Sequence, residues 1–333
     1  MSAMLPAAQA LARRHRLQWW EALPWVAALL AFYLFPNHLA FGTQLLITIL
    51  FALSLDLVLG YAGIVTLGHA AFFGAGAYTV GMLAQHAGWN EPLTGLAAAA
   101  LVAGAIGLAS GFVLLRTHGL TLLMLTLCTM VLLEESANMG HRYTGGFDGM
   151  PGLLFKPLLG AFSFDPLYFR TQYLYVLVVL LLCFVLVRAL VYSPFGQSLT
   201  GIRENLLRMH AVGAPVRVRL VVVYAASAAI AGVAGGLFTH ATQYVNLATL
   251  GLERSAGVLI MLILGGYGRL YGAFVGASAY MVLEHFLAKA YPTAWQLGVG
   301  VLLVLVALFA SNGILGIADS LRRRFAERAA ARP

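Results

Sequence analysis

Charged residues are scarce in this chain of 333 residues. Asp, Glu, Lys and Arg make up 10% of it, while hydrophobic residues make up 61% and the mean hydropathy is +0.87. Soluble globular domains carry about 25% charged residues, so an ordinary soluble domain is excluded. Repeated apolar runs of about 20 residues match the hydrocarbon thickness of a bilayer. The sequence therefore predicts an all-α polytopic membrane protein.

The motifs of common catalytic and nucleotide-binding sites are also missing. The chain has no G-x-x-x-x-G-K-[ST] loop, no H-E-x-x-H, no paired C-x-x-C and no nucleophile elbow. Its two cysteines, Cys128 and Cys183, lie inside apolar runs, which favours packing over a disulfide or a metal site. We therefore expect no catalysis by this chain, and no metal or cofactor bound to it.

What the chain does contain is a series of candidate membrane spans. They lie at residues 23–40, 43–59, 65–83, 93–115, 120–137, 172–192, 216–239, 256–267, 270–287 and 294–309. The eighth run is short, and with the ninth it forms either two crossings or a hairpin that re-enters by one side. We expect about eight to ten transmembrane helices in a domain at 23–313, between an N-terminal segment at 1–22 and a basic tail at 314–333.

Basic residues predict the orientation of these spans. With the N-terminus inside, all but five of the 20 Lys and Arg residues lie on the inner side. The five outer ones are Arg142, Lys156, Arg170, Arg254 and Lys289. This asymmetry follows the positive-inside rule and places both termini in the cytoplasm. The net charge of +8 is thus explained by topology, and we expect no nucleic acid partner.

Two glycine clusters interrupt the apolar runs. Their members are Gly60, Gly63, Gly68, Gly74 and Gly76 in the first half and Gly265, Gly266, Gly268, Gly272 and Gly276 in the second. Each glycine weakens a helix by about 1 kcal/mol relative to Ala, so we expect broken or tightly packed segments. Paired clusters of this kind indicate an inverted repeat with a site at its junction.

Broken helices in a membrane must turn their free backbone groups toward protein or water. Polar and aromatic side chains of the first cluster are therefore candidates for a solute pathway: Tyr61, Thr66, His69, Phe72, Phe73 and Tyr78. For His69, a hydrogen bond to a neighbouring helix is an equally good interpretation.

The longest polar interruption in the second half of the chain lies at 193–213. Pro194 suits the first turn of a helix and Gly213 suits a helix end. We expect one short helix on the cytoplasmic membrane surface, where a partner protein can bind it. Its candidate contact residues are Arg203, Glu204, Asn205, Arg208, His210 and Gly213.

Further polar residues lie in the outer loop and within the spans. Thr144, Gly145, Gly146 and Asp148 belong to a turned loop that could close the pathway or receive a soluble partner, although Asp148 could equally cap a turn. Carboxylates inside or at the edge of spans are Asp56, Glu134, Glu135 and Glu284, of which the three Glu residues lie near the outer ends of their spans and could simply reach water. Such groups are costly and often functional, and Asp56 is the best candidate for a structural pair.

These motifs resemble the LivM-type permease of branched-chain amino acid ABC importers over nearly the whole chain. Four blocks carry the resemblance: 60–78, 144–149, 193–213 and 259–276. The most specific pieces are Ser193-Pro194-Phe195-Gly196 and Ile202-Arg203-Glu204-Asn205. The chain departs from the family where His210 stands in place of a Glu, and where Arg269 and Ala273 replace Ser and Pro.

The resemblance implies a permease subunit in a bacterial inner (plasma) membrane. Segment 193–213 would be a coupling helix that docks on an ATP-binding subunit. Partners would be a second, LivH-like permease, two ATP-binding subunits that use ATP, a soluble substrate-binding protein and membrane lipid. A urea or short-amide importer permease shares the same motifs. An ATP-independent secondary transporter is the alternative from another class, and it would not need the segment around Arg203.

Overall fold

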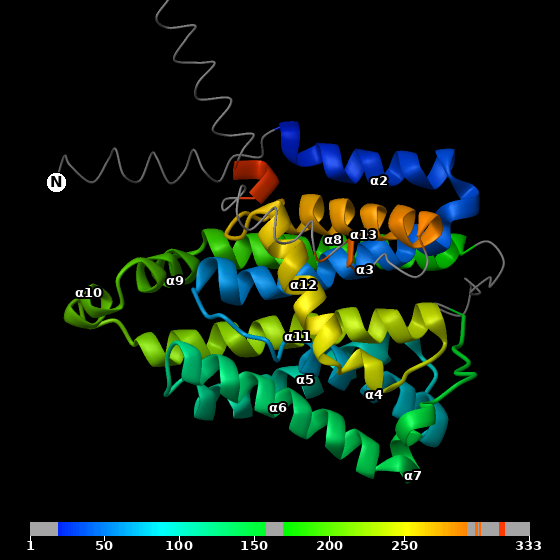
Figure 1. Ribbon diagram of the computed structural model, residues 1–333, viewed down its shortest axis with the longest axis horizontal. Coiled ribbons are helices and arrows are strands. Elements are labelled where there is room, and N and C mark those ends of the chain that lie inside the picture. The colour runs from blue at the N-terminus through cyan, green and yellow to red at the C-terminus, as the bar shows by residue number, and fades with distance from the viewer. Residues whose placement is uncertain (1–18, 158–168, 292–296, 299, 301–312, 317–333) are drawn as a thin grey trace, which may run out of the picture.

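The computed structural model describes residues 19–157, 169–291, 297–298, 300 and 313–316 (Figure 1). In this part of the chain the regular structure is helical, apart from one isolated antiparallel pairing between Met150 and Val245. Six described helices are long and apolar enough to cross a membrane: Pro36–Tyr61, Pro92–Leu114, Leu120–Met139, Arg170–Tyr192, Val216–Thr242 and Leu247–Gly265. The predicted all-α polytopic class is confirmed.

The helices form two layers around a central pair, α3 and α11 (Figure 1). The layer of α3 contains α2 (Leu23–Leu34), α3 (Leu39–Asp56), α8 (Arg170–Tyr192) and α13 (Gly272–Ala290). The layer of α11 contains α4 (Ala70–His86), α5 (Pro92–Leu114), α6 (Leu120–Met139) and α11 (Val216–Thr242). Between the layers, α12 (Leu252–Gly265) crosses obliquely.

Short helices mark the two ends of the bundle. At one end α9 (Pro194–Glu204) and α10 (Leu206–Ala211) project beyond the layers, and we call this the α9 end (Figure 1). The opposite end, here the α7 end, carries α7 (His141–Thr144) and the turn η4 (Gly146–Asp148). The remaining short elements are η1 (Trp19–Ala22), η2 (Pro36–His38), the π-helical turn η3 (Leu57–Tyr61) and η5 (Leu247–Thr249).

Small residues let α11 approach its neighbours closely. A methyl group added at Gly232 would collide with Ala103 and the backbone of Ala99, and one at Gly76 would collide with the backbone of Gly232. Lipid provides little hydrophobic driving force between helices, so this close van der Waals contact is what holds such bundles together.

The predicted first span, 23–40, is wrong in its extent. α2 stops at Leu34 after 12 residues, a turn follows at Pro36–His38, and α3 starts at Leu39. Pro36 lacks the N–H that a continuous helix would need, and its ring disfavours helical backbone at Phe35. Twelve residues rise about 18 Å, which is less than the roughly 30 Å hydrocarbon core.

The first glycine cluster breaks its helix, as predicted. After η3 the chain runs without helix from Ala62 to His69, and Gly63 has a φ of +73°. The freed N–H groups bond to protein: Gly68 N–H donates to Thr66 Oγ1 at 3.1 Å and Ala70 N–H donates to Ser255 Oγ at 3.3 Å. A non-helical segment can therefore lie inside the bundle without exposing backbone groups to lipid.

The second glycine cluster separates α12 from α13. Gly266 and Gly268 have φ values of +103° and +77°, which reverse the chain at the α9 end. α12 and α13 pack against each other as a hairpin whose outer ends lie toward the α7 end. The predicted span 294–309, segment 1–22 and the tail 314–333 fall largely outside the described residues.

Candidate functional site

The polar segment 193–213 forms two helices instead of the single predicted one. Ser193 caps α9, since its Oγ accepts from Gly196 N–H at 3.3 Å, and Pro194 follows at the first helical position. Asn205 leaves the helical conformation and caps α10, since its Oδ1 accepts from Arg208 N–H at 2.9 Å. The chain then turns away at Gly213, where φ is +79°. The break at Asn205 gives the segment an elbow.

Arg203, in the last turn of α9, contacts both glycine clusters. Its Nη1 donates to the carbonyl oxygen of Gly60, and its guanidinium lies 5.2 Å from the ring centroid of Tyr267. A Cβ at Gly63 would come within 2.9 Å of Arg203 Cγ. Although Arg203 was predicted as a contact for a partner, its side chain joins the elbow to the bundle.

Asp56 also belongs to this contact region. It is fully buried, and its Oδ1 accepts from Gly268 N–H at 2.7 Å. A methyl group at Gly60 would collide with both Asp56 Oδ1 and the backbone of Gly268, so the two glycine clusters touch here. We call the set Asp56, Gly60, Gly63, Arg203, Tyr267 and Gly268 the glycine junction. Asp56 was expected to form a structural pair, and its partner is a backbone N–H.

The outward face of the elbow is free within the described structure. Glu204, Arg208, His210 and Gly213 are exposed, in keeping with a surface segment. Two apolar side chains that the sequence analysis missed stand beside them: Leu207 is 81% exposed and Val212 is 77% exposed. They add an apolar part to the otherwise polar surface of the elbow. Their position within a charged stretch was the signal that could have found them.

The predicted pathway residues have mixed surroundings. His69 is fully buried, lies 2.9 Å from Ser54 Oγ through its Nε2, and stacks on Phe51 at 5.4 Å between ring centroids. Thr66 is also buried, and its Oγ1 accepts a hydrogen bond from the backbone N–H of Gly68 in the same loop.

The aromatic members of that prediction are largely enclosed. Phe72, Phe73 and Tyr78 are buried, whereas Tyr61 is half-buried in η3 near the glycine junction. Their part in a pathway stays a prediction, and the hydrogen bond of His69 to α3 agrees with its packing interpretation.

The loop at 144–152 is tied to the segment after α11. Met150 N–H donates to Val245 O at 2.8 Å, and Tyr244 Oη donates to the carbonyl of Asp148 at 3.1 Å. Thr144 accepts from Gly146 N–H at 3.3 Å, and both Gly145 and Gly146 have positive φ. These residues form a defined turn at the α7 end, and Asp148 is exposed at the surface.

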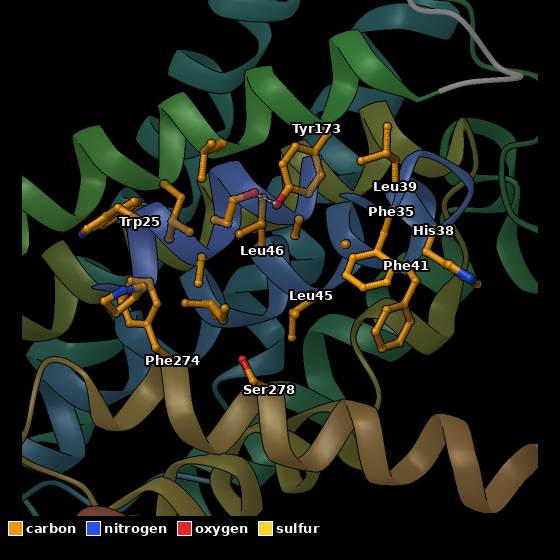
Figure 2. A pocket seen from close by; sticks show the side chains of 18 of the residues that line it. Trp25, Phe35, His38, Leu39, Phe41, Leu45, Leu46, Tyr173, Phe274 and Ser278 are labelled. Carbon is orange, nitrogen blue, oxygen red and sulfur yellow. Dashed lines mark hydrogen bonds between the residues drawn. The ribbon is translucent and has the colours of Figure 1, made fainter. Parts of the chain in front are cut away.

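One cavity between the helices is apolar. Its volume is about 600 Å³, and its walls come from α2, α3, α8 and α13 (Figure 2). The labelled side chains that line it include Trp25, Leu46 and Phe274, with few polar atoms among them. Tyr173 already donates its hydroxyl to Ala28 O at 2.8 Å. Its lining has no Asp, Glu, Lys or Arg, and His38 and Ser278 are among its few polar side chains, so the cavity suits a lipid chain better than a charged solute.

Among the described residues, no three His, Cys, Asp or Glu side chains gather as metal ligands would. The only ion pair found in the described ranges, between Glu21 and Arg188, joins the start of α2 to α8.

Comparison with known proteins covers most of the chain. Residues 37–308 match the family model "Branched-chain amino acid transport system / permease component". The chain is 29% identical to the high-affinity branched-chain amino acid transport system permease protein LivM of Salmonella typhimurium, and 28% identical to that of Escherichia coli. Each match covers 82% of this chain and 69% of the relative. No solved structure matches significantly.

Proposed function

The chain belongs to the family of branched-chain amino acid transport permeases, and from that premise we propose that it is the LivM-type permease subunit of an ATP-driven importer for branched-chain amino acids. The family and the multi-pass helical fold make it a transport subunit. In this proposal ATP is bound and hydrolysed by two separate subunits, since the chain lacks the phosphate-binding loop.

The glycine junction carries the proposal. It connects the exposed elbow to the two places where the membrane helices are broken, at Gly60 and Gly268. Glycine-rich breaks are points where a helix can change direction at low cost. Movement of α9 therefore has a direct mechanical route, through Arg203, to the segments best able to move.

Work is transferred only if the partner binds two conformational states of the permease with different affinities. We propose that the ATP-binding subunit binds the elbow through Leu207 and Val212 together with the charged side chains around them. Closure of two such subunits on ATP would pull α9, and the change at the glycine junction would alternate access between this chain and a second, LivH-like permease.

The remaining partners follow from the same model. A soluble substrate-binding protein would dock at the α7 end, where the loop at 144–152 is held to Val245. A urea or short-amide importer permease remains the near alternative, because a docking protein can determine the solute. The elbow argues against a secondary transporter working alone, since such a protein has no use for an exposed coupling surface.

Reconstitution separates these functions. The chain is placed in proteoliposomes with a second permease, two ATP-binding subunits and a binding protein, and uptake of leucine and of urea is measured with and without ATP. We expect leucine uptake that requires both ATP and the ATP-binding subunits. Accumulation of leucine by this chain alone would contradict the proposal, and uptake of urea in place of leucine would favour the alternative.

A further inference from the structure

A second cavity, of about 460 Å³, differs from the first because charged side chains line it. Its walls are formed by α3, α4, α11, α12 and α13, toward the α7 end relative to the glycine junction. Glu253, Arg254 and Glu284 lie on it, together with the phenol group of Tyr280. The volume lies within the range of about 300–1,000 Å³ that small-molecule sites occupy.

Arg254 is the central group of this cavity. Its guanidinium lies over two neighbouring aromatic rings, 4.7 Å from the centroid of Phe73 and 4.6 Å from that of Phe238. No carboxylate of a described residue lies within ion-pair distance of it, and it donates no hydrogen bond to the described protein. The rings thus fix the position of a planar cation whose N–H groups remain available to a ligand.

The position of Arg254 in the fold makes this arrangement unusual. It belongs to the apolar segment Leu247–Gly265, which is long enough to span a membrane. A charged side chain in such a segment is costly and is typical of a solute pathway. Arg254 also lies in the first turn of α12, where the helix dipole favours a bound anion.

The rest of the lining complements an amino acid. Glu253 and Glu284 offer negative charge to an ammonium group, and they come from two different helices. Phe51, Val258 and Met261 present an apolar wall. A cation, two carboxylates and an apolar wall match the three parts of an α-amino acid with an aliphatic side chain.

We propose that this cavity binds the transported amino acid, with Arg254 on its α-carboxylate and the carboxylates of Glu253 and Glu284 on its ammonium group. This assignment rests on the proposed function for the identity of the solute. It places the binding site on α12 and α13, and of the predicted pathway residues only Phe73 belongs to the lining.

The test is ligand binding to the purified permease pair with its ATP-binding subunits, without binding protein. Three probes are used: leucine, isocaproate, which lacks the amino group, and isoamylamine, which lacks the carboxylate. Arg254→Ala should weaken binding of leucine and isocaproate about tenfold or more and leave isoamylamine unchanged. The double change Glu253→Gln with Glu284→Gln should weaken leucine and isoamylamine and spare isocaproate.

Arg116→Ala is the matched control, because Arg116 also lies over an aromatic ring, 5.3 Å from Phe112, but outside the cavity. It should bind all three probes as the unmodified protein does. Should Arg254→Ala fail to assemble, Arg254→Lys is measured instead; it keeps the charge without the planar fork, so weakened leucine and isocaproate binding supports the proposal.

Three results would overturn the assignment. One is unchanged leucine affinity in the Arg254 variants. Another is lost assembly with the second permease but unchanged binding per assembled complex, which would make Arg254 an interface residue. The third is absence of leucine binding in a complex that still imports leucine from the binding protein, which would leave the proposed function intact. A complex that imports no leucine at all would instead refute the proposed function.

Discussion

Arg203, Gly60 and Gly268 come from three segments that are distant in the chain and adjacent in space. Arg203 lies 143 residues from Gly60, and Gly268 lies 212 residues from the Asp56 carboxylate that it contacts. At this scale the junction depends on the absence of side chains, because the backbone of Gly268 occupies the position that a methyl group on Gly60 would need. Asp56 can reach the Gly268 N–H only while that space stays empty.

Gly60→Ala should therefore destabilise the protein. The added methyl group meets backbone, which cannot move aside as a flexible side chain can, and overpacking of this kind costs about 1–3 kcal/mol. The midpoint of thermal unfolding in detergent should fall. Gly95→Ala is the control, since its nearest neighbour would be 3.8 Å away. If both variants melt alike, the junction is less closely packed than described.

At the scale of elements, the important features are helices that stop early. α3 ends in the turn η3, α4 starts only at Ala70, and α12 has 14 residues. Hydrogen bonds that the side chains of Thr66 and Ser255 accept from backbone N–H groups stabilise the first break. The elbow between α9 and α10 is similarly defined by the cap that Asn205 provides.

Asn205→Ala should loosen α10. Loss of an N-cap costs about 1 kcal/mol, and α10 has six residues and few other contacts that define its start. Hydrogen exchange of the amides at 206–211 should become faster by about fivefold if opening follows that free energy. Asn205→Asp keeps an acceptor and should exchange like the unmodified protein. Equal protection in Asn205→Ala would show that the cap is not what holds the elbow.

The positions of helices and breaks could be predicted from the sequence where apolar residues or glycines are concentrated. Apolar runs revealed the membrane class, and the glycines around Gly63 revealed the break between Ala62 and His69. The end of α2 was missed although Pro36 marked it, because the polar turn of three residues is short and apolar residues continue on both sides of it. Asn205, a good N-cap residue, was a readable sign of the elbow.

The contacts between distant segments could not be predicted. The local sequence does not reveal that Arg203 contacts Gly60 or that Asp56 contacts Gly268, because both contacts depend on how the helices pack. The cavity around Arg254 was hidden for the same reason: it unites side chains from five helices, and single-sequence patterns describe one helix at a time.

For the whole molecule, two polar regions lie at different depths of an otherwise apolar bundle. The glycine junction is at the α9 end, and the cavity of Arg254 lies toward the α7 end. α12 connects them directly, with Arg254 in its first turn and Gly265 at its last residue. Motion imposed on α9 can therefore reach the proposed solute site along a single helix.

The central claim is that α9 transmits work from a separate ATPase through Arg203. The most direct measurement is the number of leucine molecules imported per ATP hydrolysed by the reconstituted importer, for Arg203→Ala and for Arg217→Ala. Arg217 is the matched control, because it also donates to a backbone carbonyl, that of Phe112 at 2.9 Å, and lies 4.9 Å from the Phe112 ring. Arg203→Ala should lower the ratio about tenfold while ATP hydrolysis continues, and Arg217→Ala should leave it unchanged. An unchanged ratio in Arg203→Ala would contradict the account.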